Sequence, residues 1–332
     1  MYNINSGYGM LQAISLYAKN PTFGKVLVVM PVSDPNYNRV AEMFKHQDPD
    51  GELRLFNTLE TAYAEADTNR NDVILLSGHT THSVAAGIAW SKNRVHVVGV
   101  DADGGRLVQQ GAKVELSGNV ASAYVIKVTG VRNSFKNIKF IQSSINAAAV
   151  NVLQLAGEGT YMENCSTVFG VANNLGSASA SELLLGEDSG TFVKCSFGTD
   201  VLLKSAASSV ITLDAISGGN ADGAKSNRFV DCESIVMSSS ANALGVKLAD
   251  TAGAKFLNEF VNHKVVAVLN ATNSAIAITN GIASAAGFVE GTLLFVNPSF
   301  ANCTNGCAGV TDNVVFVGPA VSQQAGEGVT PA

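Results

Sequence analysis

Short apolar runs alternate with polar breaks along most of this chain, and the clearest succession lies in residues 57–101. Apolar residues from Leu59 to Ala66 recur at helical spacing, and Asn57 with Glu60 has the spacing of a capping box. Apolar strands are predicted after this helix at 73–76 and 95–100, with a turn at 77–79. This order predicts the start of a right-handed parallel β-helix, in which the helix covers the open end of the first coil.

A four-residue pattern then recurs about every 30 residues, as expected for a β-helix whose equivalent residues stack on one another. It begins with a large apolar residue, continues with any residue and then usually Asn, Asp or Lys, and often ends in Cys. Its copies are Phe135-Lys-Asn-Ile138, Met162-Glu-Asn-Cys165, Phe192-Val-Lys-Cys195, Phe229-Val-Asp-Cys232, Phe256-Leu-Asn-Glu259 and Phe295-Val-Asn-Pro298. The longer intervals predict insertions at 198–226 and 260–292, or an additional coil whose copy has decayed.

The stacked copies predict two interior ladders. The first is aromatic and consists of Phe192, Phe229 and Phe256; the second consists of Cys165, Cys195 and Cys232. Regularly spaced cysteines also occur in zinc ribbons. The cysteines of this chain, however, lack the paired CxxC spacing and the histidines of a zinc site.

The pattern divides the chain into three regions. Residues 1–56 are predicted to form an N-terminal α/β cap or attachment region, with strands at 25–30 and 53–56 and a helix starting at Asp34. Residues 57–310 are predicted to form the β-helix, and 311–332 a last strand with an extended tail. Such a tail is expected to be ordered against a neighbouring subunit.

Composition narrows the classes of function. Only 14% of residues are charged and the net charge is −6, without a basic cluster, so no nucleic-acid partner is expected. No apolar run reaches the ~18 residues of a membrane span. Five cysteines, an odd number, and no secretory signal predict reduced thiols in a protein made in a cytoplasm.

Carboxylates are the candidate catalytic groups, because glycan-cleaving enzymes use pairs of them. Asp231 and Glu233 flank Cys232 and are the pair of choice if the chain cleaves glycans. The other candidates are Glu187, Asp188, Asp200, Asp214 and Asp222. The favoured interpretation is that they are single solvated carboxylates on turns and strand surfaces, and aromatic platforms for sugars are scarce. The prediction is therefore that the chain is not an enzyme and uses no cofactor.

Three further motifs have residue types found in metal or disulfide sites. His79 and His82 lie in a predicted turn, not at helical spacing. The segment 101–105 starts like a calcium loop but lacks the later carboxylates. Cys303 and Cys307 enclose Thr-Asn-Gly, which is typical of a polar turn. No metal site is predicted.

The segments 58–63, 72–79 and 95–101, with 24–29 and 48–51 upstream, resemble the pectin-lyase-like β-helix opening of many tailed-bacteriophage virion proteins. The resemblance covers most of residues 20–170 and implies a homotrimer used as a capsid decoration (cement) protein, head fibre or tailspike. Low charge and few aromatics favour a decoration protein bound to the major capsid protein on the virion surface. The alternative is a tailspike or head fibre that binds or cleaves host surface glycans.

Overall fold

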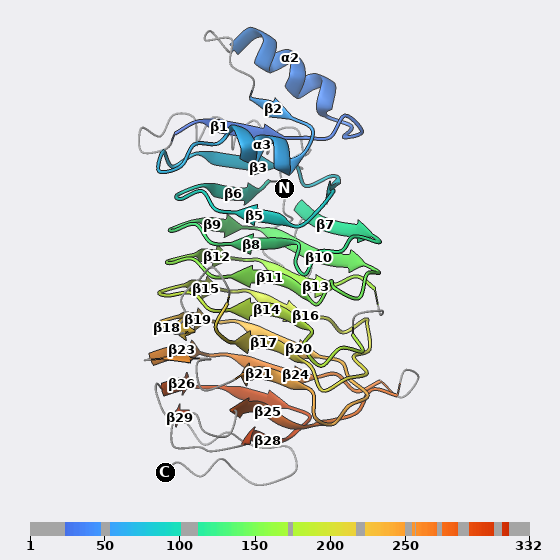
Figure 1. The fold of residues 1–332 in the computed structure, drawn as a ribbon, viewed down its shortest axis with the longest axis vertical. Helices are drawn as coiled ribbons and strands as arrows, with labels where there is room; N and C mark the ends of the chain where they lie inside the picture. The colour runs from blue at the N-terminus through green and yellow to red at the C-terminus, as the bar shows by residue number, and fades with distance from the viewer. Residues whose placement is uncertain are drawn as a thin grey trace, which may run out of the picture.

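Three parallel sheets wind around one apolar core in the computed structural model (Figure 1). The structure describes residues 24–47, 54–100, 112–171, 175–216, 223–249, 254–255, 257–270, 274–284, 292–308 and 314–318. Each complete coil adds one strand to each sheet, so neighbours in a sheet come from successive coils. The predicted fold class, an all-β parallel β-helix, is confirmed.

Sheet A has eleven strands and is the longest of the three sheets. In spatial order it contains β2 (Leu55–Phe56), β1 (Val26–Val29), β3 (Val73–Leu76), β6 (His96–Gly99), β9 (Ser134–Lys136), β12 (Tyr161–Glu163), β15 (Thr191–Val193), β19 (Arg228–Val230), β23 (Leu257–Val261), β26 (Thr292–Val296) and β29 (Val314–Val317).

Sheets B and C have eight strands each. Sheet B contains β4 (Thr81–Val84), β7 (Ala112–Gly118), β10 (Ile138–Ser144), β13 (Ser166–Phe169), β16 (Ser196–Gly198), β20 (Glu233–Val236), β24 (Lys264–Ala267) and β27 (Ser299–Ala301). Sheet C contains β5 (Ile88–Trp90), β8 (Ile126–Val128), β11 (Asn151–Leu155), β14 (Ser181–Leu185), β17 (Ser209–Leu213), β21 (Leu244–Leu248), β25 (Ile278–Ser284) and β28 (Cys303–Ala308). A small fourth sheet pairs β18 (Ala224–Lys225) with β22 (Ala254–Lys255).

The predicted helix is α3 (Leu59–Glu65), and it buries Leu59, Ala62 and Tyr63 against the first coil. Its N-cap is Thr58, so the predicted Asn57–Glu60 capping box is wrong. Thr58 has the extended backbone of an N-cap and its hydroxyl accepts the N–H of Thr61. The Glu60 carboxylate instead accepts the N–H of Ala85, which lies after β4.

Two strands were missed between β3 and β6, because β4 and β5 lie between the predicted turn at 77–79 and the predicted strand at 95–100, where no element was predicted. Upstream, β1 and β2 extend sheet A, and the helix α2 (Tyr37–Gln47) adds a second apolar cluster in which Val40 packs with the outer side of β1 and β3. The division of the chain at residue 56 stays a prediction.

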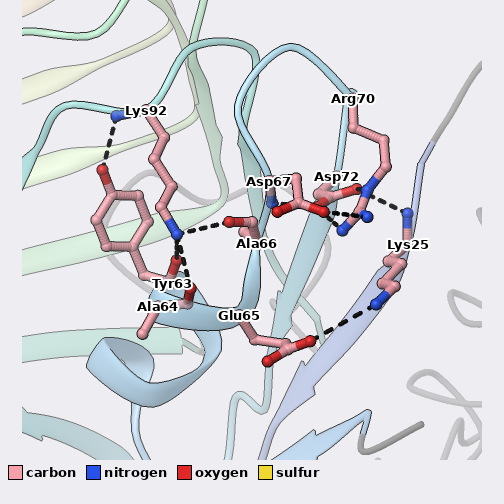
Figure 2. A network of polar contacts seen from close by, with 9 residues as sticks. All are labelled: Lys25, Tyr63, Ala64, Glu65, Ala66, Asp67, Arg70, Asp72 and Lys92. Carbon is pink, nitrogen blue, oxygen red and sulfur yellow. Dashed lines mark hydrogen bonds and ion pairs between the residues drawn. The ribbon is translucent and has the colours of Figure 1, made fainter.

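A polar network, shown in Figure 2, holds the C-terminus of α3 on the first coils. The Lys92 ammonium donates to the carbonyls of Tyr63, Ala64 and Ala66 at 2.6–2.8 Å. These carbonyls lack helical partners at a helix C-terminus, where a cation is also favoured by the helix dipole. The Tyr63 hydroxyl accepts the N–H of Lys92, and its ring stacks on Trp90 with centroids 4.0 Å apart.

Asp72 is the second centre of this network and is completely buried. Its carboxylate accepts two hydrogen bonds from the Arg70 guanidinium at 2.6 Å, and one each from the backbone N–H groups of Lys25 and Asp67 (Figure 2). Burial by itself raises the pKa of Asp72, but these four donors outweigh it and hold the pKa below its usual value. Asp72 therefore ties β1, α3 and β3 together as an ion.

The aromatic ladder is confirmed with one correction. Phe192 stacks on Phe229 at 4.3 Å between centroids, but the next ring is Phe260, at 4.4 Å, followed by Phe295 at 4.6 Å. The predicted member, Phe256, lies outside the described residues. The true copy of the pattern is Phe260-Val-Asn-His263, in which a buried histidine takes the cysteine position.

The cysteine ladder is confirmed, since Cys165, Cys195 and Cys232 are buried, free thiols in successive coils. Burial raises the pKa of Cys195 and of Cys232 well above the usual value, so both remain protonated and act as small apolar groups.

The predicted insertions at 198–226 and 260–292 are wrong, because these segments contain β17 and β24 with β25, which are ordinary strands of sheets B and C. The repeating pattern marks only the passage from sheet A to sheet B. In coils with long intervals between copies, strands of sheets B and C therefore look like insertions in the sequence.

Candidate functional site on the outer face of sheet A

Five polar side chains from three neighbouring strands gather on the outer face of sheet A. In the strand register, His96 of β6 lies opposite Ser134 of β9, which lies opposite Tyr161 of β12. Lys136 and Glu163 form the next outward row. The residues between them, Phe135 and Met162, point into the core. We call these five residues, His96, Ser134, Lys136, Tyr161 and Glu163, the polar cluster.

Glu163 is the centre of the polar cluster. Its Oε2 lies 2.8 Å from the Lys136 ammonium and accepts a hydrogen bond from the Tyr161 hydroxyl at 3.1 Å. The ammonium also lies 5.1 Å from the centre of the Tyr161 ring. Beside them, His96 Nδ1 lies 2.8 Å from the Ser134 hydroxyl.

The charges follow from these contacts. The hydrogen bond from Lys136 lowers the pKa of Glu163, and Tyr161 adds to this effect. Partial burial and the Glu163 carboxylate raise the pKa of Tyr161, while burial and Lys136 lower that of His96. At neutral pH the polar cluster therefore holds a carboxylate, an ammonium, a phenol and a neutral imidazole. Such a set of donors and acceptors suits a neutral polyhydroxyl ligand.

The C-terminal half of the same face is aliphatic. The row that starts with Lys136 and Glu163 continues in register with valines from five successive strands. We call these residues the valine stripe: Val193, Val230, Val261, Val296 and Val317. All five are at least partly exposed, and Val317 is 50% exposed.

The carboxylates predicted from the sequence are distributed over different surfaces. Asp231 has a φ of +52° in the turn between β19 and β20, and its side chain accepts a hydrogen bond from Asn262. Glu233 lies on the outer face of sheet B opposite Lys264. Asp231 is thus in a turn that requires a left-handed conformation, which Asn and Asp tolerate. The pair stays an untested alternative.

Among the other candidates, Glu187 is completely buried and Asp188 forms an ion pair with Lys225 at 3.1 Å. Asp200 lies in the corner after β16, Asp214 lies directly after β17 with its carboxylate accepting the N–H of Ala215, and Asp222 lies outside the described residues.

Two of the three motifs considered as metal or disulfide sites lie within the described residues. His82 is buried, with Nε2 2.7 Å from the Ser77 carbonyl. The segment 101–105 lies outside the described residues. Cys303 and Cys307 lie in strand β28, not in a polar turn, and burial raises the pKa of each thiol to about 11. In the described ranges, no three His, Cys, Asp or Glu side chains are placed to hold a metal ion. No helix of the described chain is long and apolar enough to span a bilayer.

The polar cluster was missed because its members come from separate coils. A signal existed, since Lys136 and Glu163 occupy the second position of consecutive copies of the repeating pattern. Three members of the valine stripe, Val193, Val230 and Val296, occupy the same position.

No family model matches this chain. No curated protein matches it either. Solved structures that match include the pectate lyase Pel9A, with 14% identity, a TM-score of 0.49, and coverage of 92% of this chain and 78% of that one. A pectin methylesterase from Aspergillus niger matches at 9% identity and a TM-score of 0.48, over 79% of this chain and 80% of that one. ORF18 of Geobacillus virus E2 matches at 10% identity and a TM-score of 0.29, over 79% and 58%. The likeness shows the fold alone.

The prediction that the chain is not an enzyme is contradicted by these neighbours, which include a pectate lyase and pectin methylesterases, although at 9–14% identity they assign no activity to this chain. The prediction failed for a physical reason. It rested on the lack of a local catalytic motif, whereas successive coils of a β-helix bring residues about 30 positions apart onto one face. A fold of this kind carries many functions, so the chemistry must be argued from the surface itself.

Proposed function

We propose that the chain is a structural protein of a bacteriophage particle, a homotrimeric decoration protein that binds the major capsid protein on the head surface. The valine stripe is the observation that carries this proposal. The phage assignment itself rests on the resemblance of residues 20–170 to virion β-helices.

The valine stripe favours self-association for a geometric reason. Its valines lie one strand apart along the solenoid, so parallel copies related by rotation about a shared axis bring equivalent valines to the same height. Burying apolar area is favourable by roughly 25 cal/mol per Å². The exposed Val315 and the half-exposed Leu294 on the neighbouring row widen the apolar area at its C-terminal end. The low charge of the chain fits a surface covered by other subunits.

The test measures the molecular mass of the purified protein in solution, and so its oligomeric state, by light scattering or analytical ultracentrifugation. The wild-type chain is expected to be a trimer, and Val230→Glu with Val261→Glu to be a monomer. Val201→Glu is the matched control, because Val201 is 70% exposed in the corner after β16, away from sheet A. Microscopy of purified phage particles then checks the position on the head. A wild-type monomer that does not bind capsids would refute the proposal.

The second candidate is a tailspike or head fibre that binds or cleaves host surface glycans, and the polar cluster favours it. Binding to a panel of neutral bacterial polysaccharides is expected to be lost in Lys136→Met and Glu163→Gln. Loss of glycan cleavage in Asp231→Asn or Glu233→Gln, with the polar-cluster variants unaffected, would assign the activity to that pair instead.

A further inference from the structure

A buried pair of charged residues lies at the corner between sheets B and C, inside the solenoid. Glu182 of β14 occupies an inward position, since the register of its neighbours places it opposite Val152 on one side and Val210 on the other. Both valines belong to the apolar core and are completely buried. A carboxyl group thus stands in a row of core valines.

Lys204 reaches this carboxyl from the next coil. It lies in the corner between β16 and β17, and its backbone is fixed by the following coil, because its N–H donates to Met237 and its carbonyl accepts from Ser238 and Ser239. Its ammonium lies 2.6 Å from Glu182 Oε2. The side chains of Lys204 and Glu182 are 1% and 0% exposed.

An ion pair in such surroundings stabilises poorly, because desolvation of both charges offsets their attraction. Transfer of one proton from the ammonium to the carboxylate removes both charges and leaves a carboxylic acid beside an amine. Burial raises the pKa of Glu182, which favours protonation of this carboxylate. The other oxygen, Oε1, has no hydrogen-bond partner among the described residues.

We propose that Glu182 and Lys204 are joined by an isopeptide bond that forms after folding. Lys204 Nζ attacks Glu182 Cδ and a C–N bond forms. The bond from Cδ to Oε2 breaks, and this oxygen leaves as water with the carboxyl proton and one amine proton. Oε1 remains as the amide carbonyl. No other reactant is needed, and the reaction replaces two buried charges with one neutral amide.

The bond would tie β14 to the corner of the following coil across 22 residues of sequence. Closing such a segment covalently restricts the unfolded chain, as a disulfide does. The link therefore predicts greater resistance of the central coils to unfolding.

Mass spectrometry of the purified full chain tests the proposal directly. The folded protein is expected to be lighter than its sequence by one water molecule. After denaturation and tryptic digestion, peptide 140–194 should be linked to 195–225, because cleavage after Lys204 is blocked. The internal control is the exposed pair Lys136–Glu163, at a similar distance of 2.8 Å, where cleavage after Lys136 should proceed normally.

A folded protein with the full mass of its sequence, and separate peptides ending at Lys194 and Lys204, would overturn the proposal and leave a buried ion pair. Chain kept in denaturant from synthesis onward should have the full mass and lose one water molecule on refolding. The double variant Glu182→Leu with Lys204→Met replaces the pair with apolar groups and should fold without the link, with a lower midpoint of thermal unfolding than the wild type. If this variant does not fold, the wild-type mass still decides.

Discussion

The two corners beside sheet A both turn through stacked left-handed residues, but they differ in residue type. At the corner that leads to sheet B, six successive coils turn through Asn137, Asn164, Lys194, Asp231, Asn262 and Asn297, all with φ between 49° and 56°. At the corner that leads from sheet C, the left-handed residues are Arg94, Arg132, Gly159, Ser189 and Ser226, with φ between 55° and 67°, and interior polar side chains also bind the neighbouring coil. Asn or Asp repeats at five of the six positions of the first corner, whereas no such type repeats at the second.

The interior row beside the second corner is linked by hydrogen bonds between coils. Asn258 Oδ1 accepts from the backbone and side chain of Asn227, and Asn227 Oδ1 accepts from Gly190 N–H. In this row Asp72, Val95, Asn133 and Thr160 precede Gly190, so the residue type changes from coil to coil.

One coil reverses the arrangement of this corner. Gly130 and Gly157 precede the polar residues Asn133 and Thr160 by three positions, whereas Glu187 precedes Gly190. A Cβ on Gly190 would lie 2.2 Å from Glu187 Oε1, so the Glu187 carboxyl fills the space that a side chain at position 190 would occupy. The comparison teaches that the interior volume is conserved from coil to coil while the residue that fills it changes.

The largest loss of stability is expected from removing one ring of the aromatic ladder, which belongs to the repeating part of the coil. Phe229→Ala deletes the ring between Phe192 and Phe260 and should cost about 3–5 kcal/mol of unfolding free energy, as for other buried Phe→Ala changes. Chemical denaturation measures it. Val230→Ala, on the outer side of the same strand, is the control and should cost far less; equal losses would contradict the ladder as a main source of stability.

The next largest effect is the pH dependence of stability that Glu187 causes at the corner from sheet C to sheet A. Burial raises the pKa of Glu187 from 4.5 to about 8, assisted by Asp188 and opposed by Thr160. Neither carboxyl oxygen has a hydrogen-bond partner of normal geometry among the described residues. Between these two pKa values the folded state keeps a proton that the unfolded state has lost. Stability should therefore fall by about 1.4 kcal/mol per pH unit as pH rises towards 8.

Between pH 5 and 7 this loss amounts to about 3 kcal/mol. In Glu187→Gln the decline should largely disappear, and the variant should overtake the wild type at alkaline pH. Denaturant unfolding at several pH values measures both slopes. Parallel curves for the two proteins would show that Glu187 is ionised in the folded protein.

A smaller effect is expected at the start of the same corner, where Asp72 is held as an ion. Asp72→Asn removes the charge that Arg70 and two backbone N–H groups bind, and should cost about 1.5–3 kcal/mol. Because the pKa of Asp72 is lowered in the folded state, its contribution is present above pH 3.8 and is lost as pH falls through the lowered value. Acid unfolding monitored by circular dichroism checks this. The variant should lack that acid-dependent step.

The smallest effect is expected at the corner from sheet A to sheet B, where a substitution should increase the stability. Lys194 is left-handed between Asn164 and Asp231, although residues other than Gly, Asn and Asp pay for this conformation. Lys194→Asn should therefore stabilise the protein by up to about 1 kcal/mol, measured as a higher denaturation midpoint. Lys194→Ala provides the control and should bring no such gain.

Much of the fold could be predicted from the sequence because the corner from sheet A to sheet B repeats its residues. The copies at Phe135, Met162, Phe192 and Phe229 gave the inner ladder and its period, and the helix at Leu59–Glu65 was found from its apolar face. Where two copies compete closely, at Phe256 and Phe260, the sequence pattern chose wrongly, since only the stacking distance of 4.4 Å to Phe229 distinguishes them.

By itself, the sequence determined what depends on local pattern: apolar strands, the short helix before the first coil, and the thiol ladder. Only the tertiary structure decided which distant residues meet, as at Asp72, Glu187, the Glu182–Lys204 pair and the polar cluster. The reason is that these contacts join residues of different coils, and their partners depend on the exact length of every corner between them. A change of one residue in a corner would shift the register and exchange inner for outer positions.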